Sequence, residues 1–296
     1  MYAACVPPVA SYGCEIWGLQ AVPRHGALGL AREKLSSGHI TILRQILGLR
    51  KNTPLHIVLL EANSAPLYHS WLFRTITLWN NLGGLDSHSL SHRVAVDSVS
   101  QALDGATNWA SDFAAALKVL DYPFELQLGT IQHIDLDLVR HLLAGQLTPV
   151  FTPSPDNICP RTCPSKGVIS CTYARWLQRP LLRCSRPPFI HLKLPSNIHR
   201  LFFRFRSGCS GLPIDIGRHT GVPRAQRLCV RCQSSTVCDE YHLVFECPYL
   251  KPLRDDFSAL FTPDTTTMVQ FMWQKDSYAV ATFVARCLRR LTEPES

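Results

Sequence analysis

The sequence predicts a mostly α-helical protein, in which a helical bundle is followed by a small irregular α module. In the first half, apolar residues recur at intervals of three and four, the period of a helix with one buried face. Strand signals are scarce in that half. Dense prolines interrupt the chain over 148–172, and a group of cysteine and histidine residues follows. We therefore expect a helical region over 1–147, a Pro/Cys-rich linker or irregular loop over 148–172, and a second region over 173–296.

Two helices are predicted near the start of the chain. The first covers 28–49, with Gly48 suited to its end. Thr53 is expected as the N-cap of the next, with Pro54 at its first helical position. The apolar positions expected on the two inward faces are Leu28, Ala31, Leu35, Ile42, Ile46 and Leu49, then Leu55, Val58 and Leu59.

Four more helices are predicted before the proline-rich stretch. Pro66 opens the first and Gly83-Gly84 ends it, while Pro123 follows the third and Pro149 closes the fourth. Their expected inward positions are Leu67, Trp71, Leu78 and Leu82; Leu90, Val94, Val99 and Leu103; Trp109, Phe113, Leu117 and Leu120; and Leu138, Leu142 and Leu147. A last amphipathic helix is expected near 280–291.

Composition narrows the class of protein. Hydrophobic residues make up 46% of the chain and charged residues 18%, which suits a globular fold. No apolar run approaches the roughly 20 residues of a membrane helix, and the first residues lack a basic, signal-like start. We expect a protein that is not secreted, so its 12 cysteines are read as buried thiols or metal ligands rather than a disulfide framework.

One cysteine and histidine group has the spacing of a zinc site. Cys229, Cys232, His242 and Cys247 form the pattern C-x2-C-x9-H-x4-C. Zinc takes four tetrahedral thiolate and imidazole ligands, and four protein ligands leave no open position, so we predict a structural Zn²⁺. The alternative is a redox pair or buried thiols, but the βαβ context of thioredoxin-like proteins is absent. Cys238 lies inside the pattern and is interpreted as a spectator.

Other features of the sequence bear on this group. Asp239 is expected to cap the short helix that presents His242. A second, looser set of cysteines has spacings that match no common zinc finger, so a second metal is not favoured there. That set is Cys159, Cys163, Cys171 and Cys184.

Positive charge is concentrated beside the cysteines. The net charge is +8, and residues 193–231 hold eight Lys or Arg against one acid, Asp215. The rest of the chain holds 22 basic and 21 acidic residues, so it is nearly neutral. A local excess of this kind is typical of a protein that binds a polyanion.

The segment 200–206 alternates arginine with aromatic residues (RLFFRFR). It predicts phosphate contacts and ring stacking on bases, or else an amphipathic helix with solvated arginines. We favour a mixture, with the aromatic residues in the core and the arginines toward the ligand. The residues predicted to contact RNA or DNA are Arg200, Arg204, Arg206, Arg218, Arg224 and Arg227.

Signatures of catalysis are weak. The chain has no P-loop, no H-E-x-x-H and no G-x-S-x-G motif. Asp135 and Asp137 would lie on different faces of a helix and are interpreted as solvated. We therefore predict that the chain is not an enzyme and has no small-molecule substrate.

Several segments of the chain form a recognisable set: 12–18 (YGCEIWG), 46–51 (ILGLRK), 53–54 (TP), Glu61, 205–213 (FRSGCSGLP), 221–224 (GVPR), 239–248 (DEYHLVFECP) and 271–274 (FMWQ). Together they resemble the C-terminal region of reverse transcriptases from non-LTR (LINE-type) retrotransposons. The Y/F-A-D-D turn of that family's polymerase palm has no counterpart here, nor has its endonuclease domain.

This resemblance implies a thumb-like helical region, followed by a zinc-knuckle-like module linked to nucleic-acid binding. Its ligands carry over to Cys229, Cys232, His242 and Cys247. It implies a non-catalytic fragment, nuclear or cytoplasmic, that binds single-stranded RNA or DNA. The alternatives are a zinc-stabilised protein-interaction module, a zinc-scaffolded nuclease using a histidine such as His219, and a relic reading frame with no selected function.

Overall fold

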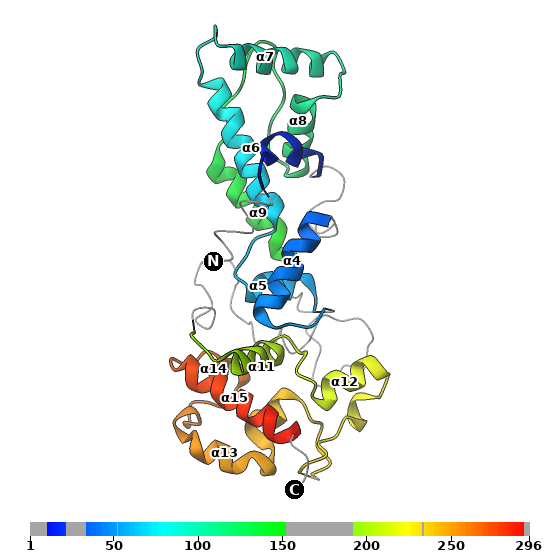
Figure 1. The fold of residues 1–296 in the computed structure, drawn as a ribbon, viewed down its shortest axis with the longest axis vertical. Helices are drawn as coiled ribbons and strands as arrows, with labels where there is room; N and C mark the ends of the chain where they lie inside the picture. The colour runs from blue at the N-terminus through cyan, green and yellow to red at the C-terminus, as the bar shows by residue number, and fades with distance from the viewer. Residues whose placement is uncertain (1–10, 22–33, 52, 152–191, 233, 293–296) are drawn as a thin grey trace. The chain divides into compact units, whose positions relative to one another are not determined.

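The computed structural model describes residues 11–21, 34–51, 53–151, 192–232 and 234–292 (Figure 1). Across these residues the regular elements are helices, and β pairing is limited to two isolated bridges. The predicted mostly helical fold is confirmed. No described helix is long and apolar enough to cross a membrane. The second cysteine set and nearly all of the proline-rich stretch lie outside the described residues.

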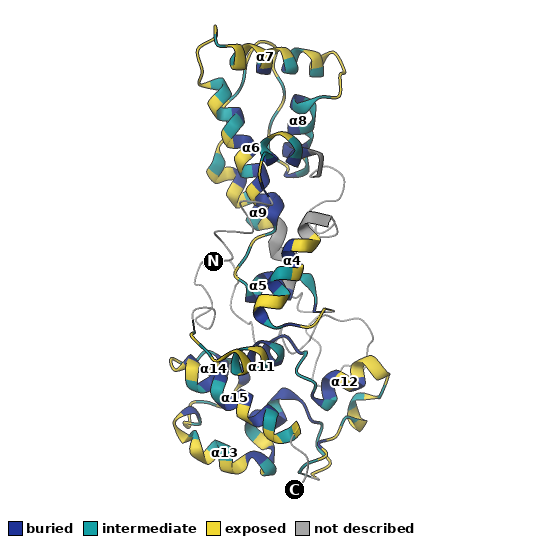
Figure 2. Cartoon of the chain, in the orientation of Figure 1, coloured by how far each residue is buried: buried dark blue, intermediate teal, exposed yellow. Residues whose placement is uncertain are grey.

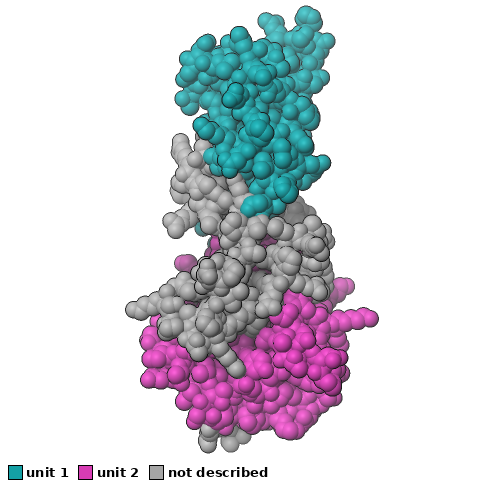
Figure 3. Space-filling model, turned by 180° about the vertical axis from the view of Figure 1, so that it is seen from behind, with its two compact units in different colours: residues 1–41, 65–150 teal, residues 42–64, 151–296 magenta. Residues whose placement is uncertain are grey.

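The chain divides into two compact units, coloured separately in Figure 3. Unit 1 comprises residues 1–41 and 65–150, and unit 2 comprises 42–64 and 151–296. The end of unit 1 lies close to the boundary predicted at 147. Residues 42–64, by contrast, belong to the second unit, although the sequence placed them within the first helical region.

Unit 1 is built around helix α6 (Leu67–Gly83), which contributes much of its buried surface. The Trp79 ring stacks on Phe113 with centroids 4.2 Å apart. The indole N–H of Trp79 donates to the Gln132 carbonyl, and Asn80 bonds both backbone groups of Ile134, so the following loop is held against α6. The other elements are α2 (Cys14–Trp17), η1 (Gly18–Ala21), α7 (Leu90–Leu103), α8 (Trp109–Val119) and α9 (Leu136–Phe151).

Unit 2 has its core between α11 (Ser196–Arg206) and α15 (Ser277–Thr292), which pack together. Phe202, Phe203 and Phe205 of α11 are fully buried, as is Phe283 of α15. Figure 2 colours the chain by how far each residue is buried. The remaining elements are the end of α4 (Lys34–Leu47), α5 (Leu55–Glu61), α12 (Pro213–Thr220), η5 (Arg224–Gln226), η6 (His242–Glu246), η7 (Pro248–Leu250), α13 (Lys251–Asp256), η8 (Ser258–Leu260) and α14 (Met268–Met272).

Two predicted helix boundaries need correction. Helix α5 begins at Leu55 with Pro54 as its N-cap, so Thr53 is not the cap. Thr53 is buried instead, and its carbonyl accepts a hydrogen bond from Arg44 at 2.8 Å. Pro149 does not close α9, which continues to Phe151, because a proline near the end of a helix removes few internal hydrogen bonds.

The inward faces of several helices are rotated from the predicted ones. Ile46 is 49% exposed, while Leu43 and Leu47 are buried. In α9, Leu138 is exposed, whereas Val139 and Leu143 are buried. Leu90, Val94 and Leu103 of α7 are also exposed, and its buried residues are Ala95 and Val99. These helices carry more apolar residues than one face can hold, so packing against neighbours decides which stripe is buried.

Candidate metal centre

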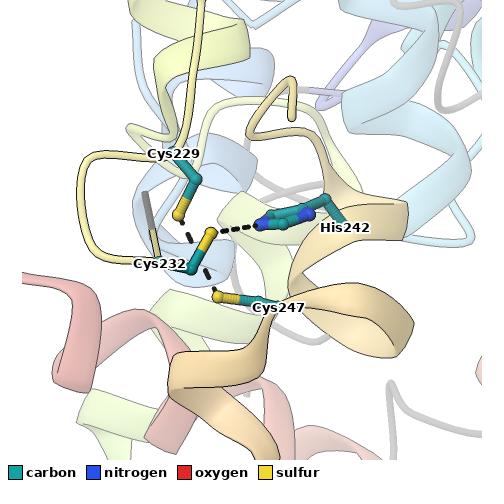
Figure 4. A group of neighbouring side chains, drawn as sticks. All are labelled: Cys229, Cys232, His242 and Cys247. Carbon is teal, nitrogen blue, oxygen red and sulfur yellow. Dashed lines mark hydrogen bonds between the residues drawn. The ribbon is translucent and has the colours of Figure 1, made fainter. Parts of the chain in front are cut away.

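Three short pieces of unit 2 present the four predicted ligands (Figure 4). Cys229 and Cys232 lie in a loop closed by the bridge between Leu228 and Val237. His242 is the first residue of η6, a single π-helical turn, and Cys247 follows its last residue. A π-helical turn is uncommon and often occurs at functional sites.

The four donor atoms surround one point. They all lie within 4.8 Å of one another. The Cys229 and Cys247 sulfurs are 4.0 Å apart, and the Cys232 sulfur is 3.3 Å from Nε2 of His242. Tetrahedral zinc with bonds of about 2.0–2.3 Å would separate its ligands by roughly 3.5–3.8 Å. A disulfide needs about 2.05 Å, so the arrangement suits a metal ion and not a bridge between these two cysteines.

Asp239 organises the helical turn that carries His242. Its Oδ1 accepts a hydrogen bond from the His242 backbone N–H at 3.0 Å, which confirms the predicted capping role. On the other side of the ring, Nδ1 of His242 is 3.5 Å from Oε2 of Glu246. A carboxylate beside Nδ1 favours a proton there and leaves Nε2 free to face Cys232, as in many metal-bound histidines.

The pKa values of the cluster thiols are shifted in opposite directions by their neighbours. Hydrogen bonds with Cys238 and Cys247 lower the pKa of Cys229, whereas the hydrogen bond with Cys229 and burial raise the pKa of Cys247. Burial lowers the pKa of His242, but hydrogen bonds with Cys229 and Cys232 outweigh it and raise it to about 9. Several thiolates can share such a buried space when a divalent cation neutralises them.

The cluster can hold a metal in a closed environment. Cys229, His242 and Cys247 are buried and Cys232 is half-buried. Four protein donors complete a tetrahedral shell, which is typical of structural rather than catalytic metal sites. Cys238 is also buried but lies outside the four-donor group, consistent with its interpretation as a spectator.

The surface role predicted for Arg206 is wrong. Its side chain is 2% exposed, and its guanidinium donates two hydrogen bonds to the buried carboxylate of Glu61. The helical period of α11 places this arginine on the same side as the buried rings. Arg206 is therefore part of the unit 2 core.

Three other predicted arginines have internal partners. Arg218 donates to Asp215 and Arg224 to Asp239, each at 2.7 Å. Arg227 donates to the carbonyls of Val222 and Ile214. These contacts stabilise the loops around the cluster. Contact of the three arginines with nucleic acid stays a prediction.

Arg200 and Arg204 remain on the accessible side of α11. Arg200 is exposed and Arg204 is half-buried, with its Nε donating to the Gly48 carbonyl at 2.9 Å. The neighbouring rings of α11 are fully buried, as expected for an amphipathic helix, so they cannot stack on bases. The structure adds Arg50, two residues after the Gly48 that both arginines contact, which was not among the predicted ligand contacts. Its only signal in the sequence was its place in a basic pair with Lys51.

The carboxylate pair in unit 1 has a structural explanation. Oδ1 of Asp135 accepts hydrogen bonds from the backbone N–H groups of Asp137 and Leu138, which caps the start of α9. Asp137 forms an exposed ion pair with Arg140.

Comparison with known proteins yields no relative. No family model matches the chain, and no curated protein or solved structure matches it either.

Proposed function

We propose that this chain binds single-stranded RNA or DNA through the phosphate backbone, with a structural zinc ion stabilising unit 2. The observation that carries the proposal is a link between the metal-competent cluster and the basic segment. Asp239 accepts hydrogen bonds from both the His242 backbone and Arg224. Ordering the cluster therefore also orders an arginine of the basic segment.

Zinc is the metal that suits this donor set. Three thiolates and one imidazole in a tetrahedral arrangement favour zinc over the hard cations, which prefer oxygen ligands. The zinc ion would join the loop of Cys229 and Cys232 to the ends of η6. Its contribution is to folding, since no position is left for water or substrate.

We also propose that the chain derives from a retrotransposon reverse transcriptase and has no catalytic activity of its own. The segments similar to non-LTR reverse transcriptases support a fragment from the C-terminal region of such an enzyme, without its polymerase residues. Such a fragment would act in the nucleus or cytoplasm and would not polymerise or cleave nucleic acid.

Salt-dependent binding of an oligonucleotide tests this function. We expect the full chain to bind a fluorescent 20-nucleotide single strand at micromolar concentration or tighter. Affinity should fall steeply between 50 and 200 mM salt, because each phosphate contact releases counterions. Zinc-loaded protein should bind and chelated protein should bind more weakly. No binding at micromolar protein, or binding indifferent to salt, contradicts the proposal.

A further inference from the structure

Three arginines from two distant segments lie together in unit 2. Arg50 follows helix α4, and Arg200 and Arg204 are one turn apart on α11. A side chain at Gly48 would meet Cγ of Arg200 at 2.8 Å, and the Gly48 carbonyl accepts from Arg204 at 2.9 Å. Both α11 arginines thus lie against the chain just before Arg50. We call these three residues the arginine triad.

The backbone at Gly48 makes this approach feasible. Gly48 has a φ of 67°, which glycine adopts readily and other residues rarely do. With no Cβ, it also leaves the space that the Arg200 side chain occupies. The turn therefore lets α11 lie against the chain just after α4, where the Gly48 carbonyl accepts from Arg204, two residues before Arg50.

The triad has no carboxylate partner among the described residues. Within the described part of unit 2, the ion pairs with arginines include those of Glu61 with Arg206, Asp215 with Arg218 and Asp239 with Arg224. No ion pair found among the described residues includes a triad arginine. The pKa of Arg204 is lowered by burial and then by the positive charges of Arg50 and Arg200, so the three cations repel one another. A bound anion would relieve that repulsion.

We propose that Arg50, Arg200 and Arg204 form a binding site for successive phosphate groups of single-stranded nucleic acid. The site deepens the proposed function and rests on it. Guanidinium groups bind phosphate oxygens through paired N–H donors, and clustered arginines are typical of phosphate recognition. The buried rings of α11 offer no stacking surface, so this site contacts the backbone and not the bases.

A matched pair of triple variants tests the site. The first is Arg50→Gln, Arg200→Gln and Arg204→Gln. The control removes three exposed cations that are not members of the triad: Arg93→Gln, Lys118→Gln and Lys275→Gln. Both variants lose the same net charge. The probe is a fluorescent oligo(dT) of 20 nucleotides, titrated from 50 to 200 mM salt. We expect the triad variant to bind at least tenfold more weakly. The slope of log affinity against log salt concentration should become shallower by about two, because each lost phosphate contact contributes roughly 0.7. The control should stay within about threefold of the wild type.

The outcomes separate this site from the general function. If the wild type binds and the triad variant binds as well as the control, the triad is not the site and the proposed function stands. If the wild type does not bind, both proposals fail. Loss of the Arg204 bond to Gly48 could unfold the triple variant, which circular dichroism would reveal. The double variant Arg50→Gln and Arg200→Gln keeps that bond and should still lose at least fivefold in affinity. An unchanged affinity in the folded double variant overturns the proposal.

Discussion

The guanidinium of Arg206 and the carboxylate of Glu61 form a two-point ion pair inside unit 2. Nε of Arg206 donates to Oε2 and Nη2 donates to Oε1, both at 2.8 Å, and the side chains are 2% and 1% exposed. The pair joins α11 to α5, although 145 residues separate the two positions. Residues 42–64 thereby become part of the same unit as the metal centre.

Removing one member of this pair should destabilise unit 2 strongly. In Arg206→Met the buried Glu61 carboxylate would lose both hydrogen bonds from the guanidinium, a change that costs about 3–5 kcal/mol. The double variant Arg206→Met with Glu61→Leu should recover most of that loss, because no buried charge remains. Urea denaturation followed by circular dichroism measures each free energy of unfolding. Lys251→Met, at the exposed pair with Asp255, is the control and should cost about 1 kcal/mol or less. A loss below 1 kcal/mol in Arg206→Met would show that the pair is not maintained.

Metal content should depend on the four cluster residues and not on Cys238. We expect the full chain to hold one zinc ion by native mass spectrometry, and Cys229→Ser to lose it, because a serine hydroxyl is a poor zinc ligand at neutral pH. Cys238→Ser is the matched control, since Cys238 is buried beside the cluster but outside the donor group. Zinc retained in Cys229→Ser, or lost in Cys238→Ser, would redefine the ligand set.

Bases should contribute little to binding. The rings of Phe202, Phe203 and Phe205 are fully buried, so α11 presents guanidinium groups without stacking partners. A 20-nucleotide abasic strand keeps the phosphates and lacks every base. We expect its affinity to lie within about threefold of oligo(dT), since stacking is worth about 1–3 kcal/mol per base where it occurs. A loss of a hundredfold would mean that aromatic contacts elsewhere dominate.

Unit 1 should lose stability in mild acid because of His69. This histidine is buried, its Nε2 has no hydrogen-bond partner in the described structure, and burial lowers its pKa to about 4. The unfolded chain, with a pKa of about 6.5, takes up a proton that the folded chain resists. The stabilising contribution is therefore complete above pH 6.5 and is lost as the pH falls toward 4, by about 2 kcal/mol at pH 5.

The variant His69→Phe checks this expectation. Its urea midpoint should change less between pH 7.5 and 5.0 than that of the wild type, because it removes the titrating group. His88→Gln, at an exposed histidine, should keep the wild-type response. Comparing variants at the same pH cancels any effect of zinc loss. Identical pH responses in His69→Phe and the wild type would contradict the assignment.

Local sequence predicted much of the molecule. The helical period located α6, α8 and α15, and prolines and glycines marked several of their ends. The spacing of Cys229, Cys232, His242 and Cys247 identified the metal-competent set, because a C-x2-C turn and a short helical turn fix neighbouring ligands over a few residues. Features of this kind depend on the chain within about twenty residues, so they can be read without a fold.

Tertiary packing determined the features that local sequence did not predict. The neighbouring elements determined which side of each helix is buried. They left Ile46 exposed and Leu47 buried on α4, and Arg200 exposed and Arg206 buried on α11. The sequence could not assign residues 42–64 to unit 2, because the partner that holds Glu61 lies 145 positions away. For the same reason, only the tertiary structure shows that the segment of Arg50 lies against the helix that carries Arg200 and Arg204. Local spacing thus determined the helices and the cluster of ligands, whereas contacts between distant segments determined which arginines pair with a carboxylate and which do not, among the residues that the structure describes.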